Sequence, residues 1–229
     1  MLENGRPSSP ATSYSFEQLL GWFGRFTPQF KFRLQSLRRQ LTADQFDNFV
    51  RESLSVFRAM MVELARVPKG PERARKVYQL IDQEFRATPP TGISCAAGCG
   101  ACCRSFPKQI TDDEADLLSS LVKSGEAAID REELTRQVEA LNSNDPVLRK
   151  SAEGAPCIFL GADNKCGVYA DRPGVCRKYH VTSPASQCST EGQGVVPRID
   201  LMPELIVSAS MSLPDNGIGF MPVKINERL

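Results

Sequence analysis

The sequence predicts a mostly α-helical protein, with a helical N-terminal region followed by a compact, irregular, cysteine-rich domain that contains a short β-hairpin. Three observations lead to this prediction. Apolar residues recur at helical spacing through the first ninety residues. All eight cysteines lie between Cys95 and Cys188. Two short apolar runs flank the turn sequence Gly161–Lys165, as in a hairpin or a metal-binding loop.

The changes in apolar pattern and cysteine content along the sequence divide the chain into four parts. We expect a flexible N-terminus at residues 1–14, a helical region at 15–90, a cysteine-cluster domain at 91–190 and a C-terminal tail at 191–229 that packs on the domain. A chain of 229 residues is long enough for one sizeable core and a smaller appended unit.

Capping signals place the N-terminal helices. Ser15-Phe-Glu-Gln18 has the form of a capping box before Leu19–Phe26. Thr27-Pro28 offers a cap and a proline for the first turn of the next helix. Thr42-Ala-Asp-Gln45 is a second capping box, and it opens the longest apolar pattern, which Pro68–Pro71 ends. A further helix extends to about Phe85.

The later elements are shorter. Thr111–Glu114 caps a helix, Asp130 begins another, and Asn144-Asp-Pro146 turns the chain into a short helical piece. Arg172-Pro173 begins a turn or helix that carries Cys176. The tail from Val195 has several prolines and short apolar runs, and its pattern predicts no defined element.

Composition excludes some functional classes. The formal net charge of +1 gives no whole-chain attraction to nucleic acid or to an acidic substrate. No apolar run approaches the roughly 20 residues that span a bilayer, so we expect no transmembrane segment. The first residues lack the basic and apolar segments of a signal peptide, and we therefore expect a cytoplasmic protein. Clustered cysteines in a reducing compartment are more often metal ligands than disulfides.

The densest cluster is Cys95-Ala-Ala-Gly-Cys99-Gly-Ala-Cys102-Cys103. Thiolates bind zinc and iron–sulfur clusters strongly, and this spacing lets one loop present several sulfurs to one site. Gly98 and Gly100 leave backbone amides free to point at the sulfurs. Side chains of neighbouring residues diverge, so the adjacent pair Cys102 and Cys103 fits two metals, or two corners of a cluster, more easily than one ion.

More dispersed cysteines supply the remaining candidates. Eight thiolates could complete two four-sulfur sites, or one site with spare thiols. His180, the single histidine, lies four residues after Cys176 and could replace a sulfur. The candidate metal ligands are Cys95, Cys99, Cys102, Cys103, Cys157, Cys166, Cys176 and Cys188.

Two blocks of this sequence resemble the CxxCxxCC family, also called the YkgJ-like cysteine-cluster family. The first block is Cys95–Cys103, here with three residues between the first two cysteines. The second contains Cys157-Ile-Phe-Leu160, Cys166-Gly-Val-Tyr169, Asp171-Arg172-Pro173 and Cys176-Arg177. The resemblance covers about residues 93 to 188 and leaves out the helical N-terminal region and the tail.

This resemblance implies a metal-binding domain whose cofactor is zinc or iron, with an iron–sulfur cluster as a further form. Some related proteins are flagellin lysine N-methylases, so the resemblance also implies a methyltransferase using S-adenosylmethionine as an alternative. Within the family pattern, Arg172, Pro173 and Arg177 form a supporting shell, in which the arginines offset thiolate charge and the proline stiffens the approach to Cys176. Tyr169 and Phe159 are expected to be core residues beside the site.

Other interpretations compete with this one. The spacing of Cys95, Cys99 and Cys102 is similar to that of radical S-adenosylmethionine enzymes, but Ala101 stands where they carry an aromatic residue. The CxxC from Cys99 to Cys102 lacks the βαβ context of a redox dithiol. A nucleic-acid-binding zinc finger is disfavoured because few basic residues adjoin the cluster.

Three functional hypotheses remain. The first is a metal-binding protein without its own chemistry, and the second is a metal-dependent enzyme such as a protein lysine N-methyltransferase. The third is an interaction protein with structural zinc, whose N-terminal helices contact an unknown protein partner. The sequence leaves open whether the protein is an enzyme.

Overall fold

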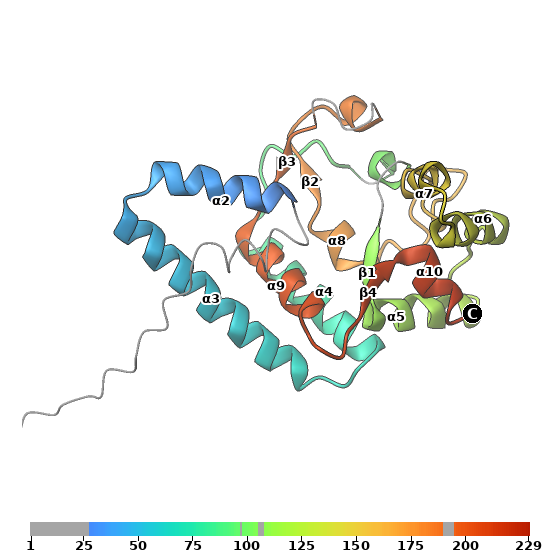
Figure 1. The fold of residues 1–229 in the computed structure, drawn as a ribbon, viewed down its shortest axis with the longest axis horizontal. Coiled ribbons are helices and arrows are strands. Elements are labelled where there is room, and N and C mark those ends of the chain that lie inside the picture. The colour runs from blue at the N-terminus through green and yellow to red at the C-terminus, as the bar shows by residue number, and fades with distance from the viewer. Residues whose placement is uncertain (1–27, 97, 105–107, 190–194) are drawn as a thin grey trace, which may run out of the picture. The chain divides into compact units, whose positions relative to one another are not determined.

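The computed structural model describes residues 28–96, 98–104, 108–189 and 195–229 (Figure 1). The predicted flexible N-terminus, the capping box at Ser15 and the helix Leu19–Phe26 lie outside these ranges. Helices account for most of the described residues and strands for few, which confirms the mostly α class. The chain divides into two compact units, Met1–Ser55 and Val56–Leu229. The four parts predicted above stay a prediction.

The first unit contains α2 (Pro28–Gln40) and the start of α3 (Ala43–Ala65), which continues into the second unit. The predicted capping box at Thr42 is present. The Thr42 amide donates to Gln45 Oε1 at 3.0 Å, and the Gln45 amide donates to Thr42 Oγ1 at 3.3 Å. The Arg38 guanidinium lies 5.8 Å from the centre of the Phe46 ring, so it links the two helices.

Four longer helices of the second unit begin where the sequence places caps or prolines. They are α4 (Pro71–Ala87), α5 (Asp112–Lys123), α6 (Arg131–Asn142) and α7 (Pro146–Glu153). The side chains of Thr111, Asp130 and Asp145 each accept a hydrogen bond from a first-turn amide. At Thr111 the capping box is complete, because the Glu114 side chain also binds the Thr111 amide.

The remaining elements are short, apart from one apolar helix in the tail. They are η1 (Ala101–Cys103), α8 (Gly174–Arg177), η2 (Ala185–Ser189), α9 (Leu201–Met211) and α10 (Met221–Asn226). Almost every side chain of α9 is buried, so the helix lacks the polar stripe that marks an amphipathic helix.

Two small antiparallel sheets connect distant parts of the second unit. Strand β1 (Gln109–Thr111) pairs with β4 (Ile218–Phe220), and Figure 1 shows these two strands side by side in its centre. Strand β2 (His180–Val181) pairs with β3 (Pro197–Arg198). Both sheets bring the tail back onto the cysteine-rich part of the chain.

Helix α4 is central to the core of this unit, because it packs against α5, α8 and α9. Its buried residues include Val77 and Ile81, while α5 contributes Leu117 and α9 contributes Leu205 and Ala209. Helix α10 packs on α5 and α6, and α6 packs on α7. Burial of these apolar side chains is the main stabilising contribution.

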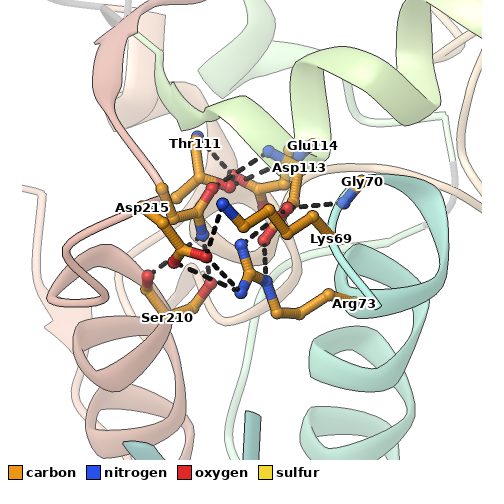
Figure 2. A network of polar contacts seen from close by, with 9 residues as sticks. Lys69, Gly70, Arg73, Thr111, Asp113, Glu114, Ser210 and Asp215 are labelled. Atoms are coloured by element: carbon orange, nitrogen blue, oxygen red, sulfur yellow. Dashed lines mark hydrogen bonds and ion pairs between the residues drawn. The ribbon is translucent and has the colours of Figure 1, made fainter. Parts of the chain in front are cut away.

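A buried polar network joins α4, α5 and the turn before β4 (Figure 2). Arg73 is only 1% exposed, and it binds both carboxylate oxygens of Asp113, with Nε–Oδ2 at 2.5 Å and Nη2–Oδ1 at 3.0 Å. The Gly70 amide donates to the same carboxylate, and Asp215 pairs with Arg73 from the other side. A buried arginine is tolerated here because its donors are matched by carboxylate oxygens.

Within the described ranges, no helix combines the length and the apolar character needed to cross a lipid bilayer.

Candidate metal centre

All eight cysteines line one cavity of about 240 Å³ in the second unit. They reach it from separate pieces of chain, and each piece is held by its own backbone hydrogen bonds. These pieces are the loop that ends in η1, the hairpin around Gly161–Lys165, helix α8 and helix η2. The structure therefore brings the dense and the dispersed cysteines of the sequence together, whereas their role as ligands stays a prediction.

Two glycines shape the first loop. Gly98 has φ +79° and Gly100 has φ +58°, a left-handed conformation that L residues with a side chain rarely adopt. A Cβ atom on Gly100 would lie 2.6 Å from the backbone oxygen of Asn164. The Cys103 amide then closes the turn onto Gly100 O at 3.0 Å. This tight turn presents four cysteines within nine residues to the cavity.

The second piece is the predicted hairpin. Leu160 and Cys166 form an antiparallel bridge, and the Gly167 amide donates to Phe159 O at 2.8 Å. The hairpin is fastened to the first loop, because the Cys157 amide donates to Cys103 O at 2.7 Å. Cys157 and Cys166 thus approach the cavity on a rigid support.

Helix α8 carries Cys176, and a buried carboxylate holds the start of this helix. The Gly174 amide donates to Glu114 Oε1 at 2.7 Å, while the other carboxylate oxygen accepts from Thr111. Glu114 and Asp113 are neighbours on α5, so the polar network in Figure 2 extends to the start of α8. Burial raises the pKa of Glu114, and its three hydrogen bonds favour the ionised form.

The last cysteine-bearing pieces are joined to the first loop around strand β2. The Ser94 amide donates to Val181 O at 2.9 Å, and the Val181 amide points at Cys95 Sγ at 3.4 Å. Helix η2 packs against η1, which brings Cys188 to the side of the cavity formed by the loop.

Burial raises the pKa of most of these thiols more than any other effect does. Hydrogen bonds from backbone amides lower the pKa of some of them. Burial raises the pKa of Cys95, Cys157 and Cys166, each of which also receives a backbone hydrogen bond that lowers its pKa. The donors are Val181 for Cys95, Phe159 for Cys157 and Val168 for Cys166. In the last two cases the donor follows the cysteine by two residues. Amide donors of this kind offset negative charge on thiolate ligands.

The adjacent pair behaves differently. Cys102 donates a hydrogen bond to Cys103, which raises the pKa of Cys102 and lowers that of Cys103. Lys108 is buried nearby, donates to Cys102 O at 2.5 Å, and lowers the pKa of both thiols through its charge. Cys103 is therefore the thiol of the pair that ionises first.

The predicted supporting residues divide into two groups. Arg172, Pro173 and Tyr169 line the cavity, and the Arg172 guanidinium lies 4.1 Å from the centre of the exposed Tyr169 ring. The charge of Arg172 lowers the pKa of Cys166. Phe159 also lines the cavity and is buried, as expected of a core residue. The same expectation is wrong for Tyr169, whose side chain is exposed beside Arg172.

Arg177 is not among the residues that line the cavity. It pairs with Asp82 at 2.8 Å, stacks 4.7 Å from the centre of the Tyr78 ring and donates to Ala170 O. Its contacts hold α8 to α4, so its position supports the fold around Cys176 rather than the thiolates directly.

His180 also lines the cavity. Its ring packs edge-on against Phe85 at 4.9 Å, and its Nδ1 is buried without a hydrogen-bond partner in the described structure. Burial lowers the pKa of His180, which favours the neutral imidazole, the form that binds metals.

Sequence reasoning missed several cavity residues. Tyr179 and Met221 line the cavity, and Met221 lies in the tail, for which the sequence predicts packing on the domain but no defined element. Glu114 was recognised only as a local capping residue. No local pattern could reveal its hydrogen bond to Gly174.

Comparison with known protein families gives one match. Residues 94–194, fewer than half of the chain, match the CxxCxxCC family, which is described as "Putative zinc- or iron-chelating domain". This match confirms the resemblance seen in the two cysteine blocks. No curated protein and no solved structure matches the chain.

Proposed function

We propose that this chain, whose segment 94–194 belongs to a zinc- or iron-chelating domain family, binds zinc or iron through its cysteine thiolates. One observation carries the proposal, namely that eight cysteines from four separate pieces of chain line a single cavity. Ordinary buried cysteines have no reason to gather in this way. All eight are free thiols, so none is consumed by a disulfide.

The chemistry of the donor set fits these metals. Thiolates are soft ligands that select zinc, iron–sulfur clusters and copper(I) over magnesium and calcium. Among the described residues, the cavity wall also supplies one imidazole, from His180, and no Asp or Glu. A wall without carboxylates disfavours hard cations.

Backbone amides and one ammonium prepare the wall for negative charge. Amide donors at Cys95, Cys157 and Cys166 and the charge of Lys108 all favour the thiolate form. Metal binding must displace thiol protons, and these contacts reduce the cost of that step.

In the described part of the chain, no three Cys, His, Asp or Glu side chains are grouped closely enough to hold a metal ion. Closure of a site would therefore involve rotation of cysteine side chains into the cavity. A volume of about 240 Å³ gives them room to rotate.

The test is anaerobic purification followed by metal analysis, acid-labile sulfide analysis and an absorption spectrum. We expect bound zinc or iron, and labile sulfide with broad visible absorption would identify an iron–sulfur cluster. Cys99→Ser and Cys176→Ser should each lower the metal content. Tyr179→Phe removes only a hydroxyl from the same wall and serves as the control. Protein that contains no metal after anaerobic preparation and reconstitution would overturn the proposal.

A further inference from the structure

We propose that the cavity binds a small organic anion beside the metal, and that Arg172 holds the carboxylate or phosphate group of this ligand. The proposal concerns the part of the cavity wall that the cysteines do not form. It rests on the proposed function, which assigns the metal to the thiols, and it extends that function from metal binding to recognition of a ligand next to the metal.

The cavity is larger than a metal ion requires. Its volume is about 240 Å³, whereas one water molecule needs only roughly 10–15 Å³. A zinc ion lies about 2.3 Å from each of its sulfur ligands, so it fills little of this room. Rotation of the cysteine side chains moves sulfur atoms that already line the wall. Space therefore remains beside the metal for a molecule of several non-hydrogen atoms.

The rest of the wall has the composition of a ligand site. Apolar and aromatic side chains contribute to it, among them Phe159, Val168 and Met221. Sites for small molecules combine such surfaces with a few polar groups that fix the orientation of the ligand. Arg172 and His180 are polar groups of this kind in the cavity wall. The buried Nδ1 of His180 has no hydrogen-bond partner in the described structure, which is costly unless a bound group pairs with it.

Positive charge decides the class of ligand. Lys108 and Arg172 line the cavity, and no Asp or Glu does so in the part of the chain that the structure describes. Lys108 donates to Cys102 O at 2.5 Å, so its ammonium group lies close to the first cysteine loop. Arg172 lies on a different piece of chain, between the hairpin and α8. An anionic ligand is therefore attracted to this wall without repulsion from a carboxylate.

Arg172 differs from other arginines of the second unit in its partners. Arg73 and Arg177 bind the carboxylates of Asp113 and Asp82. For Arg172 the described structure gives a hydrogen bond from Nη1 to Tyr169 O at 3.5 Å and a contact with the Tyr169 ring, but no carboxylate. A guanidinium has five N–H donors in a fork that matches carboxylate and phosphate oxygens. Most of these donors remain available to a ligand.

The Tyr169 ring prepares the guanidinium for this role. Arg172 Cζ lies over the ring, 4.1 Å from its centre. The ring covers one face of the guanidinium, whereas the N–H groups point outward in its plane. Tyr169 is 53% exposed, although the sequence pattern places it in the core. Its contact with Arg172 at the cavity accounts for this position of a large aromatic side chain.

The backbone places Arg172 between two candidate metal ligands. On the hairpin side, the Tyr169 amide donates to Cys166 O at 3.2 Å. On the helix side, the Cys176 amide donates to Pro173 O at 2.9 Å. Both cysteines line the same cavity as Arg172. An anion bound by this arginine therefore lies beside the thiol-bound metal.

The test uses the full chain, reduced and loaded anaerobically with zinc, and the metal content is measured first. The probes are succinate, which carries carboxylates, and inorganic phosphate. Succinamide is the neutral control of similar size. Binding is measured by ligand-observed nuclear magnetic resonance, which detects dissociation constants of about 1 mM. We expect succinate or phosphate to bind and succinamide to give no signal, and the tighter probe indicates which group the ligand carries.

Variants of the stacked pair connect this binding to Arg172. Arg172→Gln should weaken binding of the probe by about 10–150-fold, because it removes charge-assisted hydrogen bonds. Arg172→Lys should lose less, since it keeps the charge without the fork. Tyr169→Ala should weaken binding by about 2–5-fold through loss of the stacking, whereas Tyr169→Phe should bind as the wild type does. Arg149→Gln removes an exposed arginine of α7 and controls for net charge.

Three outcomes would count against the inference or its basis. Absence of binding by both anions, or equal binding to Arg172→Gln and wild type, would overturn the anion site and leave metal binding intact. Loss of zinc from Arg172→Gln, with unchanged probe affinity in the chains that remain loaded, would assign the arginine to the thiolates alone and also overturn the site. Failure of the wild type to load zinc or iron would instead overturn the proposed function.

Discussion

Glu114 accepts a hydrogen bond from the backbone amide of Gly174 at 2.7 Å, across 60 positions of sequence. The same carboxylate closes the capping box of α5 at Thr111. One buried side chain thus fixes both the beginning of a core helix and the short helix that carries Cys176.

Replacing Glu114 with Gln should destabilise the protein. The carboxylate uses both oxygens as acceptors, whereas an amide would turn an NH₂ group toward one of the donors. We expect a loss of about 1–3 kcal/mol in the free energy of unfolding, measured by denaturant titration. Glu139→Gln, at an exposed position of α6, is the matched control and should change stability little.

Gly100→Ala tests the tight turn of the first loop. The left-handed backbone alone should cost about 1–2 kcal/mol, and the clash with Asn164 O should add to it. Gly92→Ala is the matched control. Gly92 also has a left-handed backbone, with φ +67°, but no atom lies within 4 Å of the added Cβ, so this variant lacks the clash. We expect thermal unfolding to show a larger loss at Gly100, with lower metal content for that variant alone. Equal effects would contradict the role of the close approach.

Arg73→Ala should be among the more damaging single changes. It would leave the Asp113 carboxylate buried without its cation, which typically costs about 3–5 kcal/mol. Arg75→Ala, on the same helix, is the control. It removes an exposed arginine that lies 3.7 Å from Asp171, and it should lower the free energy of unfolding by about 0–1 kcal/mol. Chemical denaturation of both variants measures the difference, and similar midpoints would refute the importance of the network.

Asp112 gives a pH-dependent prediction. Burial raises its pKa, but hydrogen bonds from Lys224 and Arg228 more than offset this and hold the pKa below 3.8. The folded state therefore binds this proton less readily than the unfolded state, and the pairing stabilises the protein above that pH. Its contribution should vanish as the pH falls through the folded pKa.

Asp112→Asn should accordingly lower the stability near neutral pH by about 0.5–1 kcal/mol, after allowance for solvent screening. The difference from wild type should narrow below pH 3.8. Asp47→Asn, on the exposed face of α3, should show no such trend. A difference independent of pH would refute the linkage.

The sequence predicts local structure well where a side chain caps the N-terminus of the helix that follows it. The capping boxes at Thr42 and Thr111 and the caps at Asp130 and Asp145 all form. The hairpin around Cys166 is also present as a bridged pair. Each of these features depends on residues within a few positions of one another.

Long-range pairing was not predictable. Strand β4 has three residues, too few to show an alternating pattern, and its partner β1 lies more than a hundred residues earlier. Arg73 would be expected at the surface, and only the fold reveals the carboxylate that allows its burial. The cysteines were recognised as candidates, but their grouping depends on which backbone pieces meet.

The buried ion pair between Lys178 and Glu204, at 2.5 Å, lies across the end of the family match. Lys178 falls within the matched segment, whereas Glu204 and the cavity residue Met221 lie beyond it. A fragment limited to residues 94–194 would lose the counterion of a nearly buried ammonium and part of the cavity wall. The segment that matches the family is therefore shorter than the piece of chain that forms the cavity wall.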